Sequence, residues 1–241
     1  MINDPSEIAS LTTFRRIYSR FYSQEANEVT RLFLYAMVTT SYARAQNPLP
    51  LRSNDPPTGV KMELDTMLNI GFDFTKPKVK LKTMLDSFFE RDIPGDGARS
   101  SRQAQMLALP RVLVLRINRE DVSIYTDEEG EVGIDVRANQ SAVEFPLELD
   151  MTPYLHESSK TMIFGRQVYS LRGIILRPSD YGSGAESGHN TAVTRKSDTA
   201  DWYKYDDANV TRVDLFSMAT AKMLQTQCTM LIYVGEAGFY A

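Results

Sequence analysis

Apolar residues in the first part of the chain recur every three to four positions, the spacing of one helix face. From Ser6 to about Ala45 this spacing predicts two helices. The break between them falls near Ser23, a residue type that caps helix N-termini, and Glu25 and Glu28 suit the positive end of the second helix dipole. The apolar positions are Ile8, Leu11, Phe14, Ile17, Tyr18, Phe21, Val29, Leu32, Phe33, Ala36 and Met37.

The middle of the chain mixes a loop with short elements. From Asn47 to Gly59 it is rich in proline, asparagine and glycine, which predicts a surface loop because such residues fix φ or withhold backbone donors. Val60 to Phe74 alternates imperfectly and predicts a strand. Leu81 to Phe89 has the pattern of a short amphipathic helix after a Lys-Pro-Lys turn.

After Leu109-Pro110 the pattern is that of short strands separated by polar turns. Glycines in the segment 182–188 predict a flexible loop that ends at His189. Helices followed by many strands indicate an α+β fold with an antiparallel sheet. One helix is predicted over 215–224, and strands are predicted over 112–117, 134–136, 143–145, 167–176, 191–194, 202–205, 210–213 and 229–234.

Composition narrows the classes of function. The chain has 241 residues, 42% of them hydrophobic, enough for the core of one large or two small domains. A formal net charge of -4, without a long basic block, argues against nucleic acid and anionic membranes as partners. The chain shows no apolar run long enough to span a bilayer and no signal peptide at Met1, so we expect a soluble protein of the cytoplasm alone or of the cytoplasm and the nucleus. One cysteine and two distant histidines predict no disulfide, metal site or cofactor.

A histidine and an acid pair suggest catalytic chemistry late in the chain. His189 precedes one predicted strand, and Asp206 and Asp207 end the next. An imidazole that acts as a general base needs a carboxylate on its far nitrogen, and adjacent strands can present such a pair side by side. The attacking atom is missing, because Cys228 lies in a predicted core strand where a buried, unreactive thiol is expected.

Simpler interpretations exist for these residues. A lone loop histidine can be a solvent-exposed side chain, and Asp206-Asp207 can be an ordinary turn. His156 has no partner suggested by spacing and is expected at the surface. Trp202 and Tyr205 are expected in the core, as large aromatic side chains usually are.

Four segments stand in a fixed order along the chain: Gln24-Glu25-Ala26-Asn27-Glu28, residues 109–115, residues 143–150, and residues 182–189 together with 202–207. In this order they resemble the ubiquitin-specific protease family of deubiquitinating enzymes. The first is similar to the family's Gln box, and the second to its Leu-Pro-x-x-Leu strand. Residues 143–150 are similar to the Phe-Pro-x-x-Leu-Asp segment. The histidine and aspartate boxes match at 182–189 and 202–207. The resemblance covers about Ser6 to Val234.

The resemblance implies a papain-like fold and a set of site residues. It implies a helical remnant of the thumb over 1–46, shortened fingers over 47–108 and a palm over 109–241. His189 would be the base, Asp206 its orienting partner and Asp207 a polar neighbour. Ser187, Gly188 and Asn190 would line the narrow channel for the C-terminal tail of ubiquitin, which becomes the expected partner. For the Gln24 segment, a solvated helix start is as simple an explanation as a direct role in the active site.

Three departures from the family pattern shape the hypotheses. The family's Cys box, which carries the nucleophile, would precede Gln24 by many tens of residues, and too few residues precede Gln24 here to contain it. Catalysis by this chain alone is therefore predicted to be absent. Asn190 replaces the usual aromatic residue after the histidine. The fingers are short and lack paired cysteines, so no zinc ribbon is expected. The proteasome-associated branch of the family, which the chain resembles most, tolerates this.

Three hypotheses remain open at this point. In the first, the chain is the C-terminal part of a deubiquitinating cysteine protease whose cysteine lies on another polypeptide or was lost by truncation of the gene. In the second, it is a catalytically inactive scaffold that binds ubiquitin or a partner such as the proteasome. In the third, the four matches are coincidental and the chain is a generic α+β interaction domain.

Overall fold

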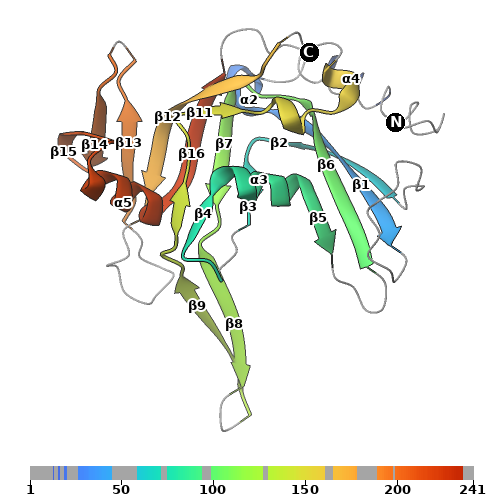
Figure 1. The fold of residues 1–241 in the computed structure, drawn as a ribbon, viewed down its shortest axis with the longest axis horizontal. Helices are drawn as coiled ribbons and strands as arrows, with labels where there is room; N and C mark the ends of the chain where they lie inside the picture. The colour runs from blue at the N-terminus through green and yellow to red at the C-terminus, as the bar shows by residue number, and fades with distance from the viewer. Residues whose placement is uncertain are drawn as a thin grey trace.

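The computed structural model describes residues 27–44, 59–71, 75–93, 99–126, 130–160, 165–177, 189–197 and 199–235, together with Thr13, Arg16, Ser19 and Arg20. Figure 1 shows two strand-rich parts side by side, with short helices around them. The structure is therefore of the α+β class, as the strand and helix patterns predict. None of the helices in the described ranges combines the length and the apolar character needed to cross a membrane.

The larger sheet, which we call the palm sheet or palm below, has eight strands in the order β15-β14-β13-β12-β16-β7-β3, with β11 paired to β12. Neighbours pair antiparallel except β3 and β7, which are parallel. Most strands here match a predicted one. Their bounds are β3 (Leu68–Ile70), β7 (Val112–Ile117), β11 (Glu148–Asp150), β12 (Val168–Leu176), β13 (Thr191–Arg195), β14 (Trp202–Asp206), β15 (Asn209–Val213) and β16 (Cys228–Gly235).

The second sheet has four strands in the order β2-β1-β6-β5 and extends to the right in Figure 1. Its strands are β1 (Tyr35–Arg44), β2 (Gly59–Asp65), β5 (Glu90–Ile93) and β6 (Arg99–Ala108). Only β2 overlaps a predicted strand, and the single strand predicted over 60–74 is divided between β2 here and β3 of the larger sheet.

The second predicted helix is wrong beyond Phe33. Helix α2 spans Glu28–Phe33, and strand β1 begins at Tyr35. Tyr35 and Met37 face the main core, whereas Ala36 and Val38 face a smaller apolar cluster with Leu107 and Ala108. Because both faces of β1 are buried, its apolar residues do not alternate with polar ones, and the run imitates a helix.

Short elements complete the fold. Helix α3 (Leu81–Phe89) has the predicted bounds, and α5 (Met218–Gln227) begins three residues after the predicted start, with the Ser217 side chain as its N-cap. The others are β4 (Lys78–Lys80), β8 (Glu120–Thr126), β9 (Val132–Ala138), β10 (Ala142–Glu144), the 3-10 turn η2 (Thr152–Tyr154) and α4 (Glu157–Lys160).

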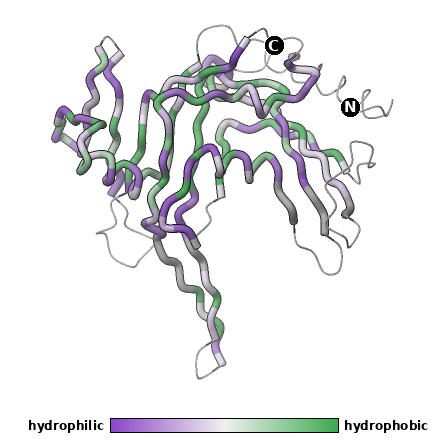
Figure 2. Tube along the Cα trace, viewed as in Figure 1, coloured by the Kyte–Doolittle hydropathy of each residue, from purple (hydrophilic) through white to green (hydrophobic). Residues whose placement is uncertain are grey.

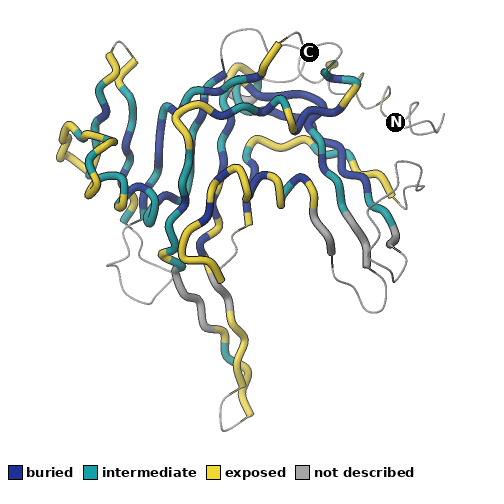
Figure 3. Tube along the Cα trace, in the orientation of Figure 1, coloured by how far each residue is buried: buried dark blue, intermediate teal, exposed yellow. Residues whose placement is uncertain are grey.

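One apolar core runs through the palm and beneath α3. Figures 2 and 3 show hydrophobic and buried positions concentrated in the central strands. Tyr169 and Tyr233 are fully buried, and each hydroxyl donates a hydrogen bond to a backbone carbonyl, of Pro110 and Pro146 respectively. Burial raises the pKa of Tyr233, so this phenol stays neutral and acts as a structural donor.

The sequence context predicts His156 at the surface, and this prediction is wrong. Its side chain is buried, its backbone N–H donates to the Met106 carbonyl at 2.9 Å, and its Nδ1 contacts the Ser158 hydroxyl. The chain after η2 packs along β6, and the hydroxyl of Ser158, two residues away, is a hydrogen-bond partner of the imidazole Nδ1. Spacing gave no sign of this burial because the covering strand β6 was itself not predicted.

Candidate functional site

His189 and Asp206 meet where two antiparallel strands lie side by side. His189 stands two residues before β13, and Asp206 is the last residue of β14. The pairing of Ala192 with Tyr205 brings the start of one strand beside the end of the other. The topology therefore creates the juxtaposition that the sequence predicts.

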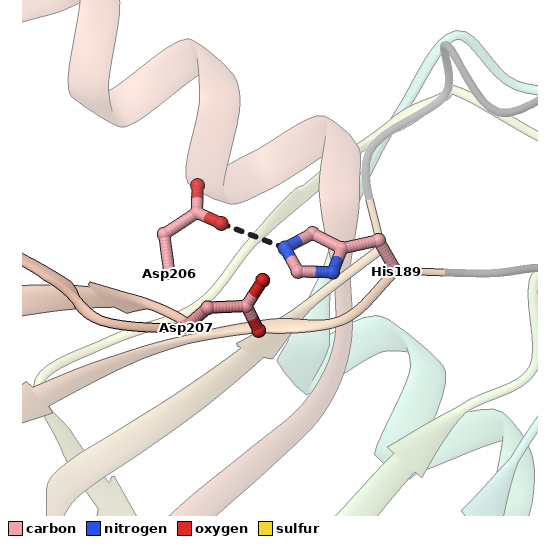
Figure 4. Close-up of side chains that lie close together, drawn as sticks. All are labelled: His189, Asp206 and Asp207. Carbon is pink, nitrogen blue, oxygen red and sulfur yellow. Dashed lines mark hydrogen bonds and ion pairs between the residues drawn. The ribbon is translucent and has the colours of Figure 1, made fainter.

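The two side chains form a direct hydrogen bond. His189 Nε2 lies 2.6 Å from Asp206 Oδ1, and Figure 4 shows the imidazole edge-on to the carboxylate. Lys204 Nζ donates to the other oxygen, Oδ2, at 3.0 Å. Asp206 thus holds a ring nitrogen with one oxygen and an ammonium group with the other.

Electrostatics favour the charged form of both partners. The hydrogen bond with Asp206 raises the pKa of His189 above its ordinary value, and the nearby Asp207 carboxylate adds to the rise. Hydrogen bonds from His189 and then Lys204 lower the pKa of Asp206. The side chains of His189 and Asp206 keep 27% and 38% of their surface exposed, so water screens this attraction.

Asp207 occupies the tight turn between β14 and β15. Its φ is 51°, a left-handed conformation that aspartate adopts more readily than most residues. This turn places the Asp207 carboxylate beside the imidazole in Figure 4. The ligand atoms of His189, Asp206 and Asp207 lie within 4.8 Å of one another, so these side chains could together reach a metal ion. Nothing else in the geometry points to one.

Cys228 is buried, as its strand context predicts. Its thiol lies 3.4 Å from Arg119 Nη2 and 3.8 Å from the Gln225 carbonyl, and burial raises its pKa. Cys228 pairs with Leu176, and Leu176 pairs with Thr191. Two strand spacings, about 10 Å, therefore separate the backbone of Cys228 from the strand that follows His189. The thiol is a core group with an arginine partner.

The remaining predicted site residues are placed only in part. Asn190 is described and exposed. Ser187, Gly188 and residues 24–26 of the Gln24 segment lie outside the described residues. Glu28, the last residue of that segment, is exposed and begins α2.

Two residues with strong contacts at or near the site are absent from the sequence-based predictions. Lys204 precedes Asp206 by two positions, which places both on the same face of β14, and this spacing could have indicated the contact. Arg119 is buried and donates to the carbonyls of Asn139, Ser141, Gln225 and Cys228. Because its partners are backbone atoms, no residue pattern reveals them.

A pocket of about 1050 Å³ lies at the opposite end of the same strands. Arg195, Trp202 and Phe216 are among its lining residues, and neither His189 nor Asp206 is. This cavity is therefore separate from the His189–Asp206 pair.

The sequence profile of the family described as "Ubiquitin carboxyl-terminal hydrolase" matches residues 6–233. The chain belongs to this family. Similar proteins include "Ubiquitin carboxyl-terminal hydrolase 15" of Schizosaccharomyces pombe, 32% identical over 108 residues, a match that covers 45% of this chain and 8% of that protein. The mouse "Ubiquitin carboxyl-terminal hydrolase 51" is 29% identical over 143 residues, covering 56% of this chain and 19% of that protein. The family predicted from the sequence motifs is thus confirmed.

Solved structures show the same fold. A chain of the Ubp8-Sgf11-Sgf73-Sus1 SAGA DUB module matches with a TM-score of 0.62 and 22% identity, covering 89% of this chain and 43% of that one. A chain of the SAGA DUB module bound to ubiquitin aldehyde matches with a TM-score of 0.60 and 21% identity, covering 97% and 49%. The palm fold of a ubiquitin-specific protease is confirmed, and this family member spans about half the length of the solved chains.

Proposed function

We propose that this chain supplies the base and its orienting carboxylate to a deubiquitinating cysteine protease. The observation that carries the proposal is the 2.6 Å contact between His189 Nε2 and Asp206. Asp206 binds Nε2, so Nδ1 is the ring nitrogen that would accept a proton from a thiol. The nucleophile would come from a cysteine outside this chain, since burial and a raised pKa make Cys228 unsuited to attack.

His189 would move protons in both halves of the reaction. It takes the thiol proton at Nδ1 as the sulfur attacks the carbonyl carbon at the C-terminus of ubiquitin. The imidazolium then gives that proton to the departing amine, which leaves an acyl-enzyme thioester. Water attacks the thioester and gives a proton to His189, and the thiol is regenerated as the carboxylate of ubiquitin departs.

Asp206 and Lys204 would keep His189 oriented for proton transfer and stabilise its protonated form. The carboxylate fixes the ring orientation and stabilises the imidazolium that forms in each step. Lys204 lowers the pKa of that carboxyl further, so Asp206 stays ionised wherever the imidazole titrates. Asp207 adds negative charge on the same side of the ring.

The test compares variants of the complete protein that contains this chain, with ubiquitin carrying a fluorogenic group on its C-terminus. His189→Gln should lower kcat/KM by about 10²- to 10⁴-fold, the usual contribution of a general base, with unchanged binding of ubiquitin. Thr211→Ser, at an exposed position of β15, serves as the control and should leave the rate unchanged. Full activity of the His189 variant would overturn the assignment.

A second candidate function is a scaffold that binds without cleaving, and the burial of Cys228 favours it. Such a chain would bind ubiquitin or a companion polypeptide while the His189–Asp206 pair has no thiol to serve. The solved neighbours bind ubiquitin and assemble with Sgf11, Sus1 and Sgf73, and the proteasome-type partner suggested by the sequence stays a prediction. Ubiquitin binding by the complete protein with no detectable hydrolysis would favour the scaffold.

A further inference from the structure

The pocket of about 1050 Å³ is lined by three segments that are far apart in the sequence. Residues 146–148 lead into β11, and residues 213–216 join β15 to α5. Between them, Arg195 at the end of β13 is paired with Trp202 at the start of β14. In Figure 1, β15 forms the outer edge of the palm sheet, with α5 beside it. A cavity of this volume accommodates a drug-sized molecule or a peptide segment of similar size.

Much of the lining of this pocket is apolar. Trp202 and Leu171 are only 7% and 1% exposed, so their side chains belong to the core that closes the pocket from below. Leu147 and Phe216 also line it, and they are 43% and 82% exposed. Exposed apolar side chains that adjoin a cavity indicate a binding surface, because a ligand that covers them removes their area from water.

Arg195 brings an unpaired positive charge to the pocket. Its Nε is buried and has no hydrogen-bond partner, and no acid within the described residues forms an ion pair with its guanidinium. Folded proteins rarely leave a buried donor or a half-buried charge without a partner, because the lost hydration is then not replaced. A carboxylate can accept two N–H bonds from one guanidinium at once. The pocket therefore has a place for a ligand that carries a carboxylate.

The other charged groups of the lining have partners or are in water. Arg212 donates to Asp201 at 2.5 Å, and Asp214 accepts the backbone N–H of Phe216 at 3.0 Å. Glu148, the third lining acid, is exposed, so water solvates its carboxylate. One unpaired cation among three acids matches a single carboxylate, whereas the acids repel a polyanion such as nucleic acid or an anionic membrane.

The edge of the palm sheet beside the pocket is open. Strand β15 pairs with β14 on one side, and no strand in the described part of the chain pairs with its other side. Arg212 and Val213, the last residues of β15, also line the pocket. An open edge presents backbone N–H and C=O groups that an extended peptide can pair with. A peptide along β15 would therefore reach the pocket, which favours a polypeptide over a small molecule.

We propose that this pocket docks an extended segment of a companion polypeptide, in which an apolar side chain and an aspartate or glutamate lie two positions apart. Alternate residues of an extended chain point to the same side, so both side chains enter the pocket. The apolar side chain covers Trp202 and Phe216, and the carboxylate binds Arg195. The pocket lies apart from the His189–Asp206 pair, and the proposal does not depend on the proposed hydrolysis.

The test titrates the full 241-residue chain with a synthetic peptide, blocked at both ends, that carries Phe-Ser-Asp between serines. Trp202 is the one tryptophan of the chain and lines the pocket, so its fluorescence reports binding there. The aspartate peptide should change this fluorescence to saturation, with an affinity that falls as salt rises. Matched peptides with asparagine or lysine instead of aspartate should bind about tenfold more weakly or worse. No fluorescence response, or equal binding of the three peptides, would overturn the proposal.

Variants of the chain separate the charged contact from the apolar one. Arg195→Gln removes the charge, so it should bind the aspartate and asparagine peptides equally. Arg116→Gln removes the same charge from an exposed position of β7 and should keep the preference for aspartate.

Phe216→Ser tests the apolar contact without risk to the core, because this side chain is 82% exposed. It should weaken the aspartate peptide by about fivefold or more. Circular dichroism of each variant checks that the palm is folded. A folded Arg195 variant that still prefers aspartate, or unchanged affinity of the Phe216 variant, would refute the proposed contacts.

Other occupants give different results in the same experiments. The molecule 3-phenylpropionate carries the same ring and carboxylate without a peptide backbone. If it binds as tightly as the aspartate peptide, the pocket is a small-molecule site and the proposal fails. If ubiquitin displaces the peptide, the pocket is a substrate contact and the proposal fails. If sedimentation shows a dimer of the chain that Phe216→Ser abolishes, a second copy occupies the pocket and the proposal also fails.

Discussion

At the scale of single residues, one carboxylate organises the candidate site. Asp206 accepts from His189 with one oxygen and from Lys204 with the other. Each contact favours the ionised acid, and the acid in turn favours the protonated ring. The arrangement is a short chain of alternating charges, and its strength should depend on pH.

The stability contributed by the pair should be greatest in mildly acidic solution. The pKa of His189 is raised in the folded state, so its contribution is full below the ordinary histidine pKa of about 6.5 and is lost as pH rises through the raised value. The pKa of Asp206 is lowered, so its contribution is full above about 3.9 and is lost as pH falls through the lowered value. In urea unfolding, Asp206→Asn should therefore cost most between these limits. A cost that does not vary with pH would contradict the pairing.

Replacing Arg119 by lysine should destabilise the palm by about 2–4 kcal/mol. An ammonium group cannot span the separate carbonyls that the guanidinium fork reaches, and unpaired buried carbonyls are costly. Urea unfolding at neutral pH measures the loss. Arg116→Lys, an exposed position three residues earlier, should change stability by less than about 0.5 kcal/mol. Similar losses in both variants would show that the buried contacts contribute little.

How far single residues can be predicted depends on their partners. His189 and Asp206 can be predicted from the sequence because each stands at the end of a recognisable local pattern, and the two patterns follow one another along the chain. The Lys204 contact could have been found from strand periodicity. Arg119 and His156 could not, since one binds backbone carbonyls from four places and the other is buried by a strand that the pattern did not show.

At the scale of elements, the type of a helix or strand can be predicted from the sequence when only one of its faces is buried, and is obscured when both faces are buried. Helix α3 exposes one side and buries Leu81, Met84, Leu85 and Phe89, so its period is clear and its bounds were predicted. Strand β1 is buried on both sides near its start, so its residue pattern indicates a helix instead of a strand. Strand β6 carries arginine, serine and glutamine in its first half, and the absence of an apolar pattern there concealed it.

Helix α3 should depend on one of its two adjacent phenylalanines far more than on the other. Phe89 is buried and stacks on Tyr154 with ring centroids 4.5 Å apart, whereas Phe88 is only partly buried. Phe89→Ala should cost about 3–5 kcal/mol in unfolding free energy, the range for large core truncations. Phe88→Ala serves as the control and should cost clearly less, as measured by thermal or urea denaturation. Equal costs would show that the stack does not anchor the helix.

At the scale of the whole molecule, the palm core and the β8–β9 hairpin, an arm formed by residues 120–138, are largely independent. The arm makes its strand pairs within itself, and the Arg119–Asn139 contact closes its base. The order of motifs along the chain was enough to predict the family and the α+β palm. The pairing of β1 with β6 was not predictable, because it joins segments far apart in the sequence that carry no shared motif.

Removal of the arm should leave the palm folded. Replacing residues 120–138 by an Asn-Gly turn between Arg119 and Asn139 should change the unfolding free energy by only about 1 kcal/mol, as expected for shortening a loop. Urea denaturation followed by tryptophan fluorescence is a suitable measurement, since Trp202 is buried in the palm. Loss of the cooperative transition would mean that the arm is part of the core.

The sealed environment of Cys228 has a practical consequence for chemical labelling. The side chain is inaccessible, and its thiol resists ionisation. Electrophilic reagents used to tag enzyme sulfur should therefore not label the native chain. Any covalent label on a complex that includes this chain would then lie on a sulfur of another polypeptide segment.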